Sequence, residues 1–306
     1  LDALRRSDPD SDPGLWYHPS EVKMKILPKC RSWKLRAAVA LCLILAIPCV
    51  LLAAGNQPYD ERKEDIKFPN HSIGLWCAKP TNPRPPTFLV IFASGDGGLH
   101  GVSKAIYEHM AEQGHYVAAY SSREALSRVK STGKFLTFAE AATAVTTLLR
   151  EAKRLLDLPD STPAIVSGCS RGASMVVFAA GEPSLKPQIC GAVAIALTRE
   201  SDYVTPPAPA ERDAYIKLDD KGGVLLYPAL DRFGSIPIAV IQSTKDSYVP
   251  SAESRQLMGP DTPTRRLYEV KASNHSFGGG KDQLLRDLDE ALDWIASTIQ
   301  SQGGSR

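Results

Sequence analysis

The 306-residue sequence has few cysteines and histidines, and what it lacks narrows its possible chemistry. Its six cysteines and six histidines form no cluster with zinc-ligand spacing. The glycine patterns G-x-G-x-x-G and G-x-x-x-x-G-K-[ST], which cradle dinucleotides and nucleotide phosphates, are absent. No internal repeat is present either. These absences argue against a zinc protein, a dinucleotide-dependent enzyme and a repeat array, and they indicate no cofactor.

Excess basic charge is confined to the N-terminal part of the sequence. Residues 1–55 contain eight Lys/Arg and five Asp/Glu, whereas residues 56–306 contain 28 Lys/Arg and 29 Asp/Glu. The larger part therefore offers no basic surface for nucleic acid. The whole sequence, with 43% hydrophobic and 23% charged residues, has an ordinary globular composition. We expect one catalytic domain with an N-terminal appendage.

One uncharged run, residues 37–54, follows six basic residues and is typical of an export signal. We assign 1–36 as an upstream extension and basic region, with Met24 as the conventional start. Residues 37–55 then form a cleaved signal peptide or a transmembrane anchor, and a buried core helix is the third interpretation. The first two place the protein in the periplasm or on the inner membrane facing it.

The rest divides into a linker with an edge strand, residues 56–85, and a domain over residues 86–302. In this domain apolar strand runs alternate with helix patterns, which predicts an α/β fold with a mostly parallel central sheet flanked by helices. The predicted strands are 73–78, 87–93, 116–120, 164–167, 190–197, 238–242 and 266–270, and the predicted helices are 103–113, 137–156, 171–180 and 282–300. Pro206, Pro207, Pro209 and the pair Gly222-Gly223 break up residues 198–235, so we expect an excursion over the sheet that forms a substrate wall.

Three cysteines, Cys77, Cys169 and Cys190, follow the N-terminal leader and belong to the catalytic part of the chain. An oxidising compartment would permit one disulfide. Cys77 with Cys190 is the favoured pair, because Cys169 lies in the turn considered next.

The most specific motif is Gly168-Cys169-Ser170-Arg171-Gly172, a G-x-S-x-G between a predicted strand and a predicted helix. Such a turn exposes the serine hydroxyl above a sheet and favours glycine on either side, where a Cβ would collide. Ser170 is therefore the candidate nucleophile of a serine hydrolase.

A serine nucleophile requires a base, which this type of fold supplies in the chain order serine, acid, histidine. His275 is the only histidine after Ser170. Asp246 directly follows the predicted strand 238–242 and is the candidate acid that orients His275. Asp231 is the rival, although it precedes that strand.

Backbone N–H groups must stabilise the oxyanion that forms during attack. Arg171 supplies one from the start of the predicted helix. The second would come from Asp96 or Gly97, in the glycine-rich loop after strand 87–93. Gly98, His100 and Cys169 are candidate substrate-binding residues, with a plain surface position as the alternative for His100.

These motifs resemble those of the VirJ/AcvB-type branch of the α/β-hydrolases, exported bacterial proteins with typical motifs S-G-D-G-G and G-Y-S-x-G-A. The corresponding segments here are Ser94-Gly95-Asp96-Gly97-Gly98 and Gly168-Cys169-Ser170-Arg171-Gly172-Ala173, followed by Asp246 and Asn274-His275-Ser276-Phe277. The similarity covers about residues 86–300. Cys169 and Arg171 depart from the more usual Tyr and Phe, and residues 198–235 do not obviously match.

The resemblance implies a periplasm-facing esterase, and some relatives are associated with removing aminoacyl groups from phosphatidylglycerol. The expected partners are thus a small-molecule or lipid ester and a membrane surface. Two alternatives stay open. One is a non-catalytic periplasmic chaperone or assembly factor on a hydrolase fold, with periplasmic protein partners. The other is a peptidase or carbohydrate esterase.

Overall fold

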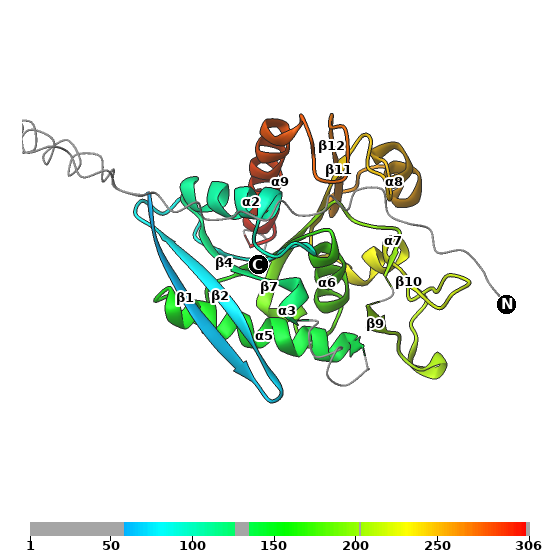
Figure 1. Cartoon of the computed structure of the whole chain (residues 1–306), viewed down its shortest axis with the longest axis horizontal. Coiled ribbons are helices and arrows are strands. Elements are labelled where there is room, and N and C mark those ends of the chain that lie inside the picture. Colours follow the sequence, from blue (N-terminus) through cyan, green and yellow to red (C-terminus); the bar gives the residue numbers. More distant parts are fainter. Residues whose placement is uncertain (1–57, 126–134, 202, 304–306) are drawn as a thin grey trace, which may run out of the picture. The chain divides into compact units, whose positions relative to one another are not determined.

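An eight-stranded sheet lies at the centre of the fold (Figure 1). The computed structural model describes residues 58–125, 135–201 and 203–303. The strand order is β1-β2-β4-β3-β6-β7-β11-β12, and the strands from β4 to β12 run parallel. Their bounds are Tyr59–Phe68 (β1), His71–Pro80 (β2), Leu89–Ala93 (β3), Tyr116–Tyr120 (β4), Ala164–Cys169 (β6), Ile189–Ile195 (β7), Ile238–Ser243 (β11) and Arg265–Val270 (β12).

The proposed upstream extension and signal or anchor segment lie outside the described residues. Within the described ranges, no helix is long and apolar enough to cross a membrane.

Helices cover both faces of the sheet, as expected for parallel strands that are buried on both sides. In β3, Leu89 and Ile91 pack in one core cluster with α5 and α6, whereas Val90 and Phe92 pack in a second cluster with α2 and α9. This alternation follows from the two-residue period of a strand. The helices are Gly101–Glu112 (α2), Ser122–Ala125 (α3), Phe138–Leu155 (α5), Arg171–Ala180 (α6), Leu226–Ala229 (α7), Ser251–Met258 (α8) and Lys281–Gly303 (α9). The predicted mostly parallel α/β sheet is confirmed.

Local signals located two helices well. Helix α6 has the predicted bounds, and α5 begins with the predicted capping box. There Glu140 N donates to Thr137 Oγ1 at 3.2 Å, and Thr137 N donates to Glu140 Oε2 at 2.9 Å. Helix α8 was not predicted, because it is only eight residues long and buries only three of them.

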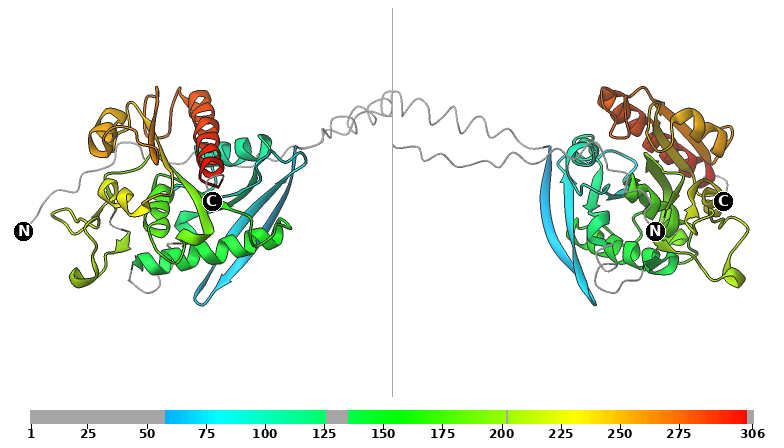
Figure 2. Two further views of the ribbon diagram at one scale, coloured as in Figure 1. Left: turned by 180° about the vertical axis from the view of Figure 1, so that it is seen from behind. Right: turned by 45° about the vertical axis from the view of Figure 1, so that its right-hand side comes forward.

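The N-terminal edge of the sheet is a long hairpin (Figure 2), and its outer strand β1 is rich in charged residues. The sequence predicted a linker and one edge strand, but β1 and β2 pair antiparallel over ten residues each, and β2 also pairs with β4. In β1 only Ile66 is buried, so the apolar alternation that reveals a strand is missing. Its Asp, Glu, Lys and Arg side chains blunt the open edge against pairing with other chains.

Residues 198–235 leave the main sheet, as predicted, but they carry structure of their own. Short strands pair as β10 with β8 and as β5 with β9. The segment then returns to the core through α7. The short elements here and nearby are Leu136–Thr137 (β5), Glu200–Ser201 (β8), Val204–Thr205 (β9), Val224–Leu225 (β10), and 3-10 helices at Lys186–Gln188, Pro209–Glu211 and Leu230–Phe233.

The predicted disulfide between Cys77 and Cys190 is wrong. Cys77 lies in β2 and Cys190 in β7, with β4, β3 and β6 between them. Four strand spacings amount to about 19 Å, well beyond the roughly 7 Å that a disulfide spans between Cα atoms. Cys77, Cys169 and Cys190 are all free.

Candidate active site

Ser170 occupies a strained turn between β6 and α6. Its φ of 54° and ψ of −118° are unusual for a residue with a side chain. The flanking glycines are required by space. A Cβ on Gly168 would lie 2.3 Å from Gly172 O, and one on Gly172 would lie 2.1 Å from Ala93 O. The turn thus has the tight strand-to-helix geometry that the motif predicted, and it presents the hydroxyl beyond the end of the sheet.

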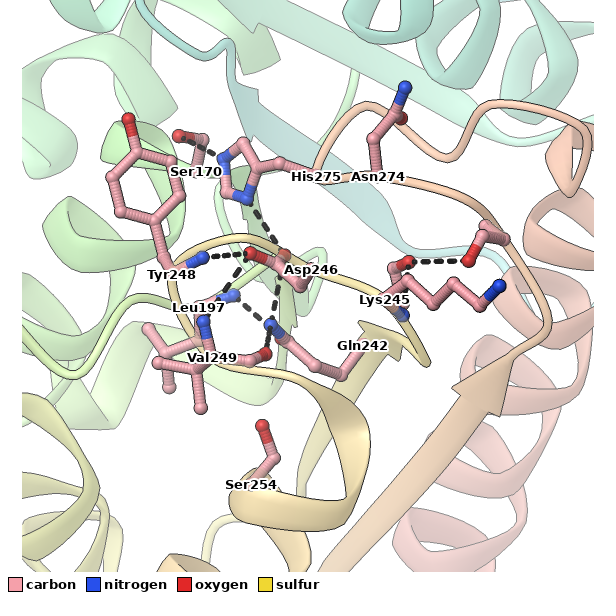
Figure 3. A network of polar contacts seen from close by, with 12 residues as sticks. Ser170, Leu197, Gln242, Lys245, Asp246, Tyr248, Val249, Ser254, Asn274 and His275 are labelled. Atoms are coloured by element: carbon pink, nitrogen blue, oxygen red, sulfur yellow. Dashed lines mark hydrogen bonds and ion pairs between the residues drawn. The ribbon is translucent and has the colours of Figure 1, made fainter.

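Ser170, His275 and Asp246 form one chain of polar contacts (Figure 3). His275 Nε2 lies 2.9 Å from Ser170 Oγ, and His275 Nδ1 lies 2.7 Å from Asp246 Oδ2. The three residues follow β6, β12 and β11, whose parallel alignment brings their carboxyl ends to the same edge of the sheet. With a proton on Nδ1, the Nε2 lone pair is free to accept the serine proton.

Asp246 is held in place by four donors. Its side chain is fully buried. Oδ1 accepts the backbone N–H groups of Tyr248 at 2.8 Å and Val249 at 3.4 Å, while Oδ2 accepts Gln242 Nε2 at 3.1 Å besides His275. These bonds compensate for burying a carboxylate and orient it toward the imidazole.

Gln242 is a site residue that the sequence analysis missed. It is completely buried at the end of β11. Besides Asp246, its Nε2 bonds Val249 O at 2.6 Å, and its Oε1 accepts Leu197 N–H at 3.0 Å. A polar residue closing the apolar run IAVI, four positions before Asp246, was the available signal.

The rival acid, Asp231, does not reach His275. It lies in the 3-10 helix Leu230–Phe233 and pairs with Arg265 at the start of β12. Tyr248, which the sequence did not single out, does reach His275. Its ring meets the imidazole edge-on, with centroids 4.7 Å apart, and is 64% exposed.

The loop Gly95–Gly98 lies against the turn at Ser170. A Cβ on Gly95 would be 3.5 Å from Ser170 Cβ. Gly95 N–H donates to Ser103 Oγ at 3.2 Å, and Gly98 N–H to Gly95 O at 3.0 Å. In the part of the chain that the structure describes, the N–H groups of Asp96 and Gly97 have no acceptor. Both are therefore available to an oxyanion, together with the N–H of Arg171 at the first position of α6.

The three candidate substrate-binding residues do not lie together in the structure. Gly98 and His100 line an open cleft of about 710 Å³, together with Gly97. Cys169 instead is 4% exposed, and its side chain belongs to the core cluster on the α2 and α9 face. Burial raises the pKa of the Cys169 thiol to about 12. The Cys169 side chain therefore packs in the core beneath the turn at Ser170 and is not accessible to a substrate.

No family model and no curated protein sequence matches the chain. Solved structures do. Est1E from Butyrivibrio proteoclasticus is similar over 76% of this chain and 99% of its own, with 16% identity and a TM-score of 0.53. A candidate dienelactone hydrolase from Klebsiella pneumoniae is similar over 78% of this chain and 98% of its own, with 15% identity and a TM-score of 0.56.

A third structure, the acylaminoacyl peptidase of Pyrococcus horikoshii, is similar over 80% of this chain and 42% of its own, with 17% identity and a TM-score of 0.55. At such low sequence identity these comparisons establish the fold alone. The chain has the α/β-hydrolase fold.

Proposed function

We propose that the protein is a serine hydrolase that cleaves a carboxylic ester through Ser170, His275 and Asp246. The observation that carries the proposal is the continuous contact from Ser170 Oγ through His275 to the buried Asp246, at 2.9 and 2.7 Å, on a strained turn. A binding module has no need for such a chain. Strain of this kind persists only where the surrounding structure enforces it, and it is concentrated at functional sites.

In the acylation step His275 Nε2 takes the proton of Ser170 as Oγ attacks the ester carbonyl carbon. The negative charge that develops on the carbonyl oxygen is stabilised by the N–H of Arg171 and by that of Asp96 or Gly97. Asp246 stabilises the imidazolium. His275 then protonates the departing alcohol, which leaves the acyl group on Ser170.

Deacylation repeats these roles with water. His275 removes a proton from a water molecule whose oxygen attacks the acyl carbon, and then returns the proton to Ser170 Oγ as the acid leaves. The same N–H groups stabilise the second oxyanion.

For the substrate we propose an aminoacyl ester of a phospholipid, hydrolysed on the periplasmic side of the inner membrane. The support is the S-G-D-G-G loop at residues 94–98, which resembles that of the VirJ/AcvB type, and the basic and apolar sequence of residues 23–54. A tether or export signal there would bring the domain to a membrane surface.

The test is turnover of a panel containing aminoacyl-phosphatidylglycerol, short acyl esters and peptides. We expect Ser170→Ala to lower kcat by at least about 10³-fold on every ester that the wild type cleaves. Ser297→Ala, an exposed serine on α9, is the matched control and should retain wild-type turnover. Undiminished ester cleavage by Ser170→Ala would exclude this mechanism. If Ser170→Ala instead restores full function to a deletion strain, the protein acts as a chaperone or assembly factor.

A further inference from the structure

We propose that the cleft bordered by β1, β2, α2 and α3 binds an anionic group, a carboxylate or phosphate, on one half of the substrate ester. This inference rests on the proposed function. The cleft holds about 710 Å³, within the range of small-molecule sites. It belongs to the same end of the sheet as Ser170, because both border the loop Gly95–Gly98.

The loop Gly95–Gly98 connects the cleft to the candidate nucleophile. Gly95 packs on Ser170, whereas Gly97 and Gly98 line the cleft. A Cβ built on Gly97 would meet nothing within 4 Å, so the loop presents bare backbone there. A carbonyl oxygen held by Gly97 N–H would therefore leave the rest of the substrate free to pass over the loop into the cleft.

The charges that line the cleft favour an anion. Three cations, Lys63, Lys104 and Arg123, face two carboxylates, Glu61 and Glu124, and the exposed His100 adds a further donor.

One of the two carboxylates is held by the backbone of a neighbouring strand. Glu124 Oε2 accepts Gly74 N–H at 2.9 Å. Tyr107 also lines the cleft, and its buried hydroxyl makes no hydrogen bond to the residues that the structure describes. Burial, and after it the charge of Glu61, raises the pKa of Tyr107.

Two of the three cations form no ion pair with a described residue. Lys104 pairs with Glu108 at 3.3 Å. Within the ranges that the structure describes, neither Lys63 nor Arg123 has a carboxylate at ion-pair distance. Lys63 Nζ instead lies 4.4 Å from the centroid of the Trp76 ring, a cation–π contact that holds the ammonium at the wall. Lys63 and Arg123 are thus the groups placed to pair with an anion in the cleft.

The test uses sets of esters that share the acyl and leaving groups and differ only at the far end, which is a carboxylate, a phosphate or a neutral amide. The wild type should show a higher kcat/KM for an anionic ester, mainly through KM, and the preference should shrink with added salt. Which anion gains more distinguishes the two sources of negative charge.

Replacement of Lys63 or Arg123 by a neutral residue should reduce this preference for anionic esters. For Lys63→Gln and Arg123→Gln we expect the anionic-to-neutral ratio to fall about two- to fivefold each, as for partly exposed ion pairs. Lys67→Gln, on the same strand and outside the cleft, is the matched control and should keep the ratio. Ester cleavage without any preference, or a ratio that survives both substitutions, would overturn the inference alone. Absence of cleavage of every ester would contradict the proposed function as well.

Discussion

Arg171 Nε lies 2.5 Å from Asp96 Oδ1, so the residue after the candidate nucleophile is paired with the loop that carries the second oxyanion donor. The Arg171 guanidinium also stacks on Tyr203, 3.8 Å from the ring centroid. Its side chain is only 20% exposed. One arginine therefore connects the turn at Ser170, the glycine loop and the segment 198–235.

Asp96→Asn should loosen the glycine loop. The substitution keeps the side-chain shape and removes the charge that pairs with Arg171, so the N–H groups of Asp96 and Gly97 would be less well aimed. We expect kcat to fall by about tenfold, less than the 10²- to 10³-fold typical of deleting an oxyanion donor, with a smaller change in KM. Steady-state kinetics on one good ester would measure both parameters.

A double-mutant cycle separates this role from general damage. Arg171→Met should also lower kcat, and the double variant Asp96→Asn/Arg171→Met should lose little more than the worse single variant, because both remove the same contact. Losses that multiply would show that the two side chains act independently.

Gln242→Leu should impair both stability and turnover. The substitution keeps the volume roughly constant but leaves Leu197 N–H and Val249 O without their bonds and Asp246 with one donor fewer. Each buried group left unpaired costs about 1–3 kcal/mol. Urea unfolding and kcat are the measurements. Gln256→Leu, exposed on α8, is the control, and equal behaviour of the two variants would contradict the assigned role of Gln242.

His115 makes stability depend on pH. It is 3% exposed and stacks on Phe88 at 5.0 Å between centroids. Burial, aided by Arg84, lowers the pKa of His115 to about 4. The unfolded chain takes up this proton near pH 6.5, so acid favours unfolding. The stability that neutral His115 confers is complete above about pH 6.5, and up to about 3 kcal/mol of it is lost as the pH falls toward 4.

His115→Phe removes the titrating group and keeps the ring stack. Urea unfolding of wild type and variant at pH 7.5 and 4.5 should therefore show a smaller acid-induced loss in the variant. The same loss in both proteins would indicate that other groups cause the acid sensitivity.

Features encoded within a few residues were predictable from the sequence. The turn at Ser170 depends on glycines two positions away on either side, and the capping box at Thr137 depends on Glu140 alone. His275 followed from chain order, because no other histidine comes after Ser170. In each case the physical cause lies within one segment or in a simple ordering rule.

Features that depend on pairing between distant segments were not predictable. The strand β1 has no apolar alternation, so only its backbone bonds to β2 define it. The contact of Arg171 with Asp96 joins positions 75 residues apart. The error on Cys77 and Cys190 has the same origin, because strand order decides their separation.

The central claim, that Ser170 is the nucleophile, is tested most directly by locating the adduct of a fluorophosphonate probe by peptide mass spectrometry. The probe phosphonylates a serine only where a base and an oxyanion site activate it. We predict one adduct, on Ser170, absent after heat denaturation and absent in Ser170→Ala. An adduct on another residue, or labelling that persists in Ser170→Ala, would contradict the account.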